Sequence, residues 1–156
     1  MGLAMACGRG PRLSPRVETA RPLLTEENIV HIGSRALDPA EHQAMSASAM
    51  KLYSAESVRS EGMAKVAKDT ANYLSDRCDW IVCHLDVDAV DPEFNPGVNF
   101  PEPSGLSIVD VTEMVRALQR TGKLRIFNLT AYNPLFDRDV KSRDTLLSLV
   151  AELFSS

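Results

Sequence analysis

The chain has 156 residues and a formal net charge of −4, a size that suits one domain with a core of its own. The negative balance and the lack of a basic cluster argue against a nucleic-acid surface, and no apolar run approaches the length of a membrane span. Residues 1–10 lack the basic start of a signal peptide, and the 3 cysteines have no metal-type spacing. We therefore expect a cytoplasmic protein with reduced thiols.

Strand and helix patterns alternate along the chain, which is typical of a parallel sheet packed between helices. We expect a short helix at 2–8 and a proline-containing loop at 10–27. The predicted strands are 28–32, 51–54, 80–85 and 123–130, and the predicted longer helices are 38–48, 61–77, 107–121 and 140–154. Stripes along the last three helices are predicted to face the core, through Val66, Thr70, Tyr73, Leu74, Ile108, Val111, Met114, Val115, Leu118, Leu146, Leu147, Val150, Leu153 and Phe154.

Two carboxylates follow the apolar strand at 80–85. Asp86 and Asp88 are two residues apart, so in an extended strand they would point to the same face. Ligands in open α/β sheets bind at this carboxyl edge, and a hard divalent cation would relieve the repulsion between the two groups. Turn or helix-cap chemistry is the alternative, because Asp is common where a strand turns and Asp91-Pro92 is itself a turn signal.

The whole segment 86–107 resembles the second metal signature of the ureohydrolases, the family of arginases and agmatinases. That signature runs Asp-x-Asp-x-x-Asp-Pro, then Pro-Gly, then Pro-x-Pro-x-Gly-Leu, and each part stands here at the family spacing. The resemblance implies a three-layer αβα fold with a parallel sheet. It also implies that Asp86 and Asp88 bind manganese, which is a dinuclear centre in the complete family site. The prolines and glycines would form a rigid loop behind them.

A second match covers residues 28–41 and is closest to arginases, in the pattern Val-x-Ile-Gly-x-Arg-x-x-Asp-Pro-x-Glu. There the Asp and the Glu help to hold the substrate's α-amino group, which implies this role for Asp38 and Glu41. Read from the residues alone, Asp38 would be the N-cap of a helix that starts at Pro39, with Glu41 favoured in the first turn. Both interpretations place Asp38 and Glu41 on one side of the helix start.

The chain also departs from the family pattern. The Gly-Gly-Asp-His and Asp-Ala-His-x-Asp elements, which supply the other metal ligands, do not occur, so residues 1–156 are expected to be an arginase-like domain fragment without the N-terminal half. His84 should share the face of Asp86, either as a polar residue behind the site or as a ligand. Ala131 stands where the family usually has the Glu that holds the guanidinium. Nearby, Asp137 and Asp139 are predicted to cap the final helix rather than to take the place of that Glu.

The resemblance implies a manganese-dependent hydrolase in which the metal makes hydroxide available near neutral pH to attack a guanidinium carbon and release urea. The substrate would be a guanidino amino acid such as arginine. Agmatine is the alternative, because Ala131 replaces the Glu that usually holds the guanidinium. The family also implies a homo-oligomer, a trimer or a hexamer. The chain alone is expected to be inactive, and no residue is assigned as catalytic. Three alternatives remain: a ureohydrolase whose N-terminal half is missing from this sequence, a non-catalytic subunit that assembles with a complete relative, and a different small metal-binding α/β protein.

Overall fold

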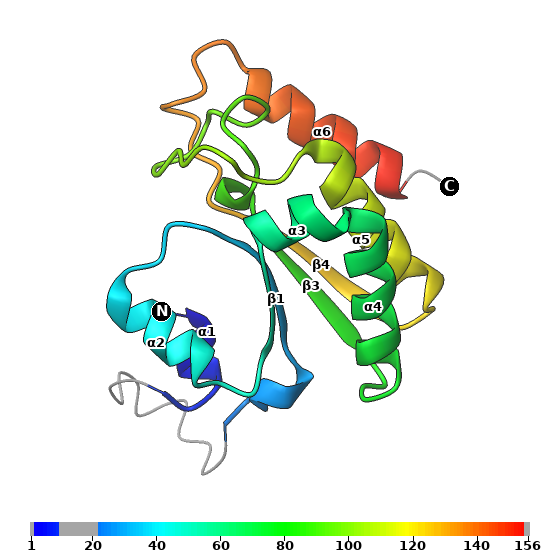
Figure 1. The fold of residues 1–156 in the computed structure, drawn as a ribbon. Helices are drawn as coiled ribbons and strands as arrows, with labels where there is room; N and C mark the ends of the chain where they lie inside the picture. The colour runs from blue at the N-terminus through cyan, green and yellow to red at the C-terminus, as the bar shows by residue number, and fades with distance from the viewer. Residues whose placement is uncertain (1, 10–21, 155–156) are drawn as a thin grey trace.

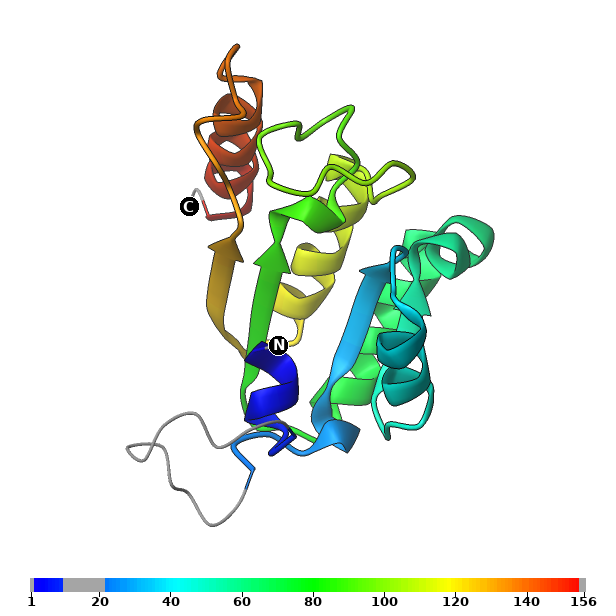
Figure 2. The same ribbon diagram turned by 90° about the vertical axis from the view of Figure 1, so that its left-hand side faces the viewer.

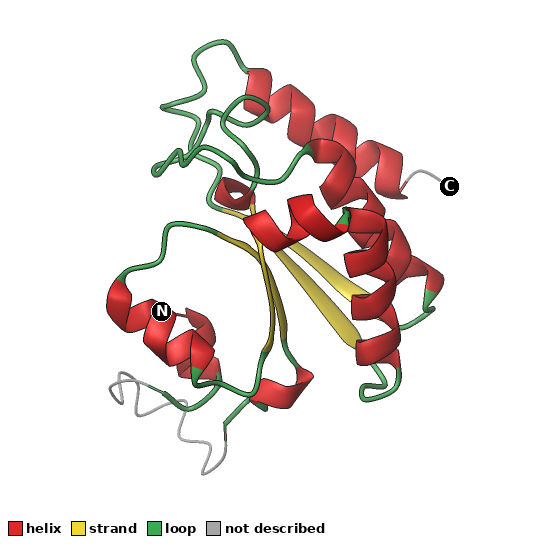
Figure 3. Ribbon diagram, viewed as in Figure 1, coloured by secondary structure: helices red, strands yellow, loops and turns green. Residues whose placement is uncertain are grey.

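The computed structural model describes residues 2–9 and 22–154 of the chain. Helices and parallel strands alternate in the order α1 (Gly2–Ala6), η1 (Glu26–Asn28), β1 (Val30–Ser34), α2 (Pro39–Ser46), β2 (Lys51–Ser54), α3 (Ala55–Glu61), α4 (Met63–Ser75), β3 (Ile81–Asp86), η2 (Val87–Ala89), α5 (Ile108–Arg120), β4 (Leu124–Thr130) and α6 (Lys141–Phe154). The α/β class with parallel strands is therefore confirmed, and Figure 3 shows how helix and strand are distributed.

The strands form two parallel pairs. β1 pairs with β2, and β3 pairs with β4 in a register that sets Val82 opposite Ile126 and Asp86 opposite Thr130. The two pairs run in the same direction (Figure 2), so their carboxyl ends lie toward one side of the molecule. Figure 1 shows α1 and α2 on one side of β1, with α4 and α5 on the other. This arrangement places the ends of β1 and β3, and the loops after them, near one another.

The core forms where α4 and α5 pack together beneath the strands. Val66 is fully buried on α4, Val115 is 1 % exposed on α5, and Ile81 and Leu85 of β3 contribute the strand face. The stripes predicted for α4 and α5 are confirmed, because their members are buried or half-buried. None of the helices in the described part of the chain has the length and apolar content needed to cross a membrane.

The predicted face of α6 is correct only in part. Leu146 and Leu153 are buried as expected, but Leu147 is 62 % exposed and Phe154 is 48 % exposed, and Val150 also lies at the surface. The helix packs on α5 with one side only, so its other apolar side chains lie outside the core. Leu149, which the predicted stripe does not include, is 1 % exposed and takes the central position.

One helix is absent from the predicted set. α3 begins directly after β2, because the Ser54 hydroxyl accepts a hydrogen bond from the Ser57 backbone N–H at 3.0 Å and so caps the new helix. Gly62, with φ of 83°, then separates α3 from α4. The predicted helix at 61–77 therefore begins two residues later, at Met63. The predicted loop at 10–27 lies largely on residues 10–21, outside the described residues.

The start of α5 carries a capping box, as the Ser-x-x-Asp pattern predicts. The Ser107 hydroxyl accepts from the Asp110 N–H at 3.1 Å, and the Asp110 carboxylate accepts from the Ser107 N–H at 2.9 Å. We expect S107A to lower the free energy of unfolding by about 1 kcal/mol, since the cap is lost. Urea unfolding followed by circular dichroism measures this change. S107T keeps a capping hydroxyl and should stay near the wild type; equal losses in both variants would contradict the capping explanation.

Candidate functional site

Two carboxylates lie where β3 ends. Asp86 is the last residue of the strand and is exposed, whereas Asp88 lies in the short 3-10 helix η2 and is half-buried. Between them, Val87 is fully buried and fixes the turn to the core. The strand thus ends two residues earlier than simple alternation through Asp88 requires. The two carboxyl groups are nevertheless close enough to interact, since Asp86 contributes to the raised pKa of Asp88.

The electrostatics of this pair are unfavourable without a positive ion. Burial, hydrogen bonding with Asp86 and the Asp86 charge raise the pKa of Asp88 to about 6, and the positive charge of Arg35 offsets only part of this effect. Carboxylate oxygens are the ligands that hard divalent cations prefer. The pair therefore fits such a cation, which would stabilise both charged groups at once.

The ligand set of the described residues is incomplete. Within residues 2–9 and 22–154, no group of three or more His, Cys, Asp or Glu side chains could hold a metal ion. His84 points its ring toward β4, where Nδ1 lies 3.2 Å from Asn128 Nδ2 and Nε2 lies 3.2 Å from Thr130 Oγ1. These contacts support the interpretation of His84 as a polar residue behind the site.

The loop after η2 is closed by Asp91, the third Asp of the signature. Its carboxylate accepts from the Glu93 N–H at 2.9 Å and from the Gly105 N–H at 3.0 Å, and the first of these bonds is the main reason why the pKa of Asp91 is lowered. An isolated parallel bridge joins Val90 to Leu106 beside it. Asp91 therefore stabilises the loop, in agreement with the turn signal, and its oxygens are already engaged.

Asp38 and Glu41 take the positions that the helix-start interpretation predicts. The Asp38 carboxylate accepts from the Glu41 N–H at 2.8 Å and caps α2, with Pro39 at the first helical position. Both side chains are exposed. A capping carboxylate has a second oxygen, so this geometry leaves Asp38 able to accept another hydrogen bond.

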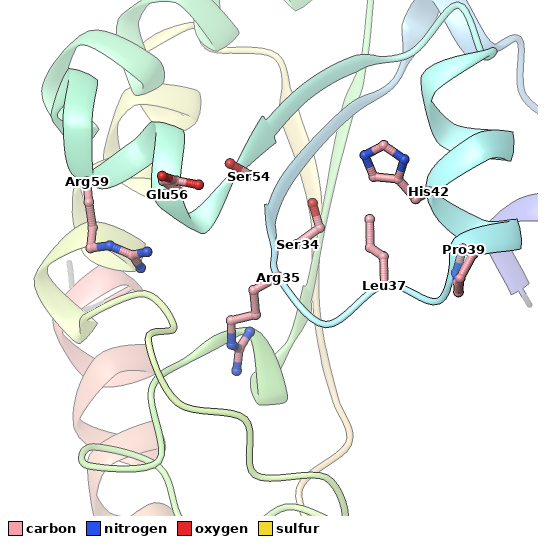
Figure 4. A pocket seen from close by; sticks show the side chains of 8 residues that line it. All are labelled: Ser34, Arg35, Leu37, Pro39, His42, Ser54, Glu56 and Arg59. Carbon is pink, nitrogen blue, oxygen red and sulfur yellow. The ribbon is translucent and has the colours of Figure 1, made fainter.

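A cavity of about 530 Å³ lies beside this segment, between the β1–α2 connection and the start of α3 (Figure 4). Its lining combines two guanidinium groups with hydroxyl, imidazole, carboxylate and apolar side chains, from Ser34, Arg35, Leu37, Pro39, His42, Ser54, Glu56 and Arg59. In Figure 4, Arg35 and Arg59 both point toward the loop that follows β3. The cavity therefore adjoins the loop of the Asp86–Asp88 pair.

The end of β4 differs from the family pattern in its chemistry. Ala131 is exposed and has φ of 67°, a left-handed conformation that is uncommon for residues other than glycine. No carboxylate stands at this position. Asp137 is buried and, as predicted, caps α6: it accepts from the Ser142 N–H at 2.9 Å and the Arg143 N–H at 2.8 Å. Burial opposes ionisation of Asp137, but these amides lower its pKa.

A protein-family model, described as the arginase family, matches residues 12–155. The chain belongs to the arginase family. Arginase from Bacillus subtilis (strain 168) is 33% identical over 153 residues, which are 98% of this chain and 51% of that protein. Arginase from Bacillus caldovelox is 29% identical over 154 residues, which are 99% of this chain and 52% of that protein. The chain thus spans about half the length of the curated relatives it matches.

Solved structures agree with the assignment of this chain to the arginase family. A crystal structure of Bacillus subtilis arginase superposes with a TM-score of 0.91 at 32% identity and covers 100% of this chain and 55% of that one. For the agmatine ureohydrolase of Thermoplasma volcanium the TM-score is 0.72 at 24% identity, over 84% of this chain and 42% of that one, which shows the shared fold. The chain thus corresponds to about half of the arginase-like fold in these structures.

Sequence reasoning missed two residues that organise the site. Arg35 belongs to the arginase pattern in 28–41, but the pattern alone gives it no function. Gly105 is part of the Pro-x-Pro-x-Gly-Leu element, and a Cβ at this position would collide with the backbone of Asp91, which explains why a glycine stands there. The one hint in the sequence is that Arg35 lies three residues before Asp38. The carbonyls of Asp88 and Glu102, to which it donates, lie more than 50 residues further along the chain.

Proposed function

We propose that this chain forms part of a manganese-dependent ureohydrolase of the arginase type, in which Asp86 and Asp88 hold the metal. The observation that carries this proposal is the close Asp86–Asp88 pair at the end of β3, inside the complete family signature. When bound, the metal would supply hydroxide near neutral pH. Asp38 and Glu41, at the start of α2, are proposed to contact the α-amino group of a guanidino amino acid.

The chain's own residues would position the reactants. Asp86 and Asp88 bind the cation through their carboxylates, and the loop clasped by Asp91 keeps them at the end of the strand. Asp38 is oriented by its bond to the Glu41 N–H, so its remaining oxygen can accept from a substrate ammonium group. Two carboxylates leave most coordination positions to water or to ligands outside this chain, so metal affinity should be weak and this chain alone is proposed to be inactive.

One observation favours a second candidate, a non-catalytic arginase-like subunit that assembles with a complete relative. Ala131 stands where the family usually places a guanidinium-binding Glu, and it offers no carboxylate there. Loss of such a charge-assisted contact costs about 1.5–3 kcal/mol of binding. A chain with this end of β4 would bind arginine poorly even inside a completed site.

The experiment that separates the candidates begins with the polypeptide from its source cells. We would measure its intact mass and its manganese-dependent urea release from arginine and from agmatine, beside the recombinant 156-residue chain. A mass near 17.1 kDa without urea release supports the subunit, and a mass about twice as large with urea release supports the enzyme. We expect no urea from the recombinant chain. Manganese-dependent urea release by that chain alone would show that it needs no further ligands.

A further inference from the structure

Arg35 lies in the connection between β1 and α2, yet its guanidinium bonds to the loop after β3. Its Nη2 donates to the Asp88 carbonyl at 2.6 Å and to the Glu102 carbonyl at 2.7 Å. Its Nε donates to the carbonyls of Glu102 and Pro103, each at 3.2 Å. The same side chain therefore reaches the turn that bears Asp88 and the far arm of the signature loop.

These acceptors are all backbone carbonyls. Nη1 adds longer bonds to the Ala89 carbonyl at 3.4 Å and to the Gly33 carbonyl at 3.5 Å. A guanidinium presents five N–H donors in a rigid planar fork, and Arg35 uses all three of its nitrogens on these carbonyls, with Nη2 bonded to both chain segments. Arg35 thus fixes the spacing between η2 and the segment at 102–103.

The bond to the Asp88 carbonyl bears directly on the candidate metal site. Asp88 lies in η2, a single turn of three residues, so a bond to its carbonyl holds the stretch of backbone from which its side chain projects. Arg59 holds the same loop through one bond, from Nη1 to the Ser104 carbonyl at 2.6 Å. Of these two arginines, Arg35 is the one that bonds to the backbone of Asp88 itself.

Arg35 also connects the two segments to which we assign function. It is three residues from Asp38, whose carboxylate caps α2, and it bonds across to Asp88. β1 approaches the loop closely here, because a Cβ on Gly33 would lie 3.1 Å from the Leu106 side chain. A shift of the β1–α2 connection would therefore be transmitted to the turn that carries Asp88.

We propose that Arg35 is a positioning residue that holds η2 so that Asp86 and Asp88 present their carboxylates together to one divalent cation. The inference rests on the proposed function, because it concerns the same carboxylate pair. Arg35 binds neither the ion nor the substrate. It acts through the backbone of Asp88, as residues that orient ligands do in other metal sites, where their removal costs about 10–100-fold in affinity.

The test compares the intact chain with R35M and R35K. Mn²⁺ is titrated while the paramagnetic broadening of the amide signals at 86–91 reports site-specific binding. Amide exchange at Asp91 and Leu106 reports the loop, since their N–H groups donate to the carbonyls of Leu106 and Ala89, each at 2.9 Å. We expect both variants to bind Mn²⁺ about tenfold more weakly and to exchange these amides faster. R35K keeps the charge but lacks the fork, so charge alone should not restore binding.

R116M is the matched control, because Arg116 forms a surface ion pair with Glu152 on α6. It should match the wild type in both measurements. Wild-type affinity in R35K would overturn the inference, and so would faster exchange in R35M with unchanged affinity, since Arg35 would then be structural only. A wild-type chain that binds no Mn²⁺ at 86–91 would instead overturn the proposed metal function, and the inference with it.

Discussion

D88N is expected to weaken Mn²⁺ binding by more than about 100-fold, beyond the loss typical of a residue that only orients a ligand. The substitution removes one of the two charged oxygen donors at the end of β3 and leaves an amide of similar shape. Titration of the intact chain, followed by broadening of the amide signals at 86–91, measures the change. D69N removes one negative charge from the exposed side of α4 and serves as the control. Equal binding by D88N and the wild type would show that Asp88 is no ligand.

The pH dependence of Mn²⁺ binding tests the same pair in the unmodified chain. The pKa of Asp88 is raised to about 6 from its ordinary value of 3.8, because of burial and the neighbouring Asp86. A proton on Asp88 competes with the cation, so affinity should rise as pH increases through about 6 and then level off. A flat profile between about pH 5 and 7 would argue against a metal held by Asp88.

The same shift predicts how folding stability changes with pH in the absence of metal. The pKa of Asp88 is about 6 in the folded chain, which therefore keeps this proton up to that pH, whereas the unfolded chain releases it near 3.8. This contribution to stability is therefore fully present below pH 3.8 and is lost as pH rises through about 6. Because the amide that D88N introduces cannot ionise, the stability of this variant should be less sensitive to pH than that of the wild type across the same window. Urea unfolding at a series of pH values measures the difference, and parallel profiles for the two chains would contradict the assignment to Asp88.

The sequence predicted the strands well because each combines a short apolar run with a clear boundary. The predicted strand at 51–54 matches β2, and the capping box at Ser107 fixes the start of α5. The helix α3 was missed because Ser54 both ends a strand and caps a helix, which leaves no loop residues between the two. The face of α6 was partly wrong, since periodicity reports an apolar stripe but not how much of it a neighbour covers.

The sequence placed Asp86 and Asp88 together at the end of β3, but it did not reveal the side chain that holds the turn between them and the loop. Strand alternation predicted that Asp86 and Asp88 lie together. They do so through the 3-10 turn η2, which contains Asp88, and not through an extended strand. Arg35 could not be assigned a partner, because its acceptors are backbone carbonyls, and a carbonyl has no sequence signature. Contacts of this kind depend on how β1 and the loop after β3 pack, which is a tertiary property.

G105A is expected to have a large structural effect from a single added methyl group. A Cβ on Gly105 would lie 2.6 Å from the Asp91 backbone N, 2.7 Å from the Ala89 carbonyl O and 2.8 Å from the Val90 carbonyl C. These are backbone atoms, so no side-chain rotation can relieve the collision. The loop must open at the Val90–Leu106 bridge, and we expect a loss of about 3 kcal/mol in the free energy of unfolding.

Opening of the loop by G105A should also displace the Asp86–Asp88 carboxylate pair. The Gly105 N–H donates to Asp91, and Arg35 holds Asp88 against the adjacent segment at 102–103, so displacement of this arm releases η2. We expect faster amide exchange at Asp91 and Leu106 together with weaker Mn²⁺ binding. G2A is the matched control, because a Cβ on Gly2 meets nothing within 4 Å. If G105A kept wild-type stability and exchange, the loop could accept a side chain, and the glycine would not be what sets its shape.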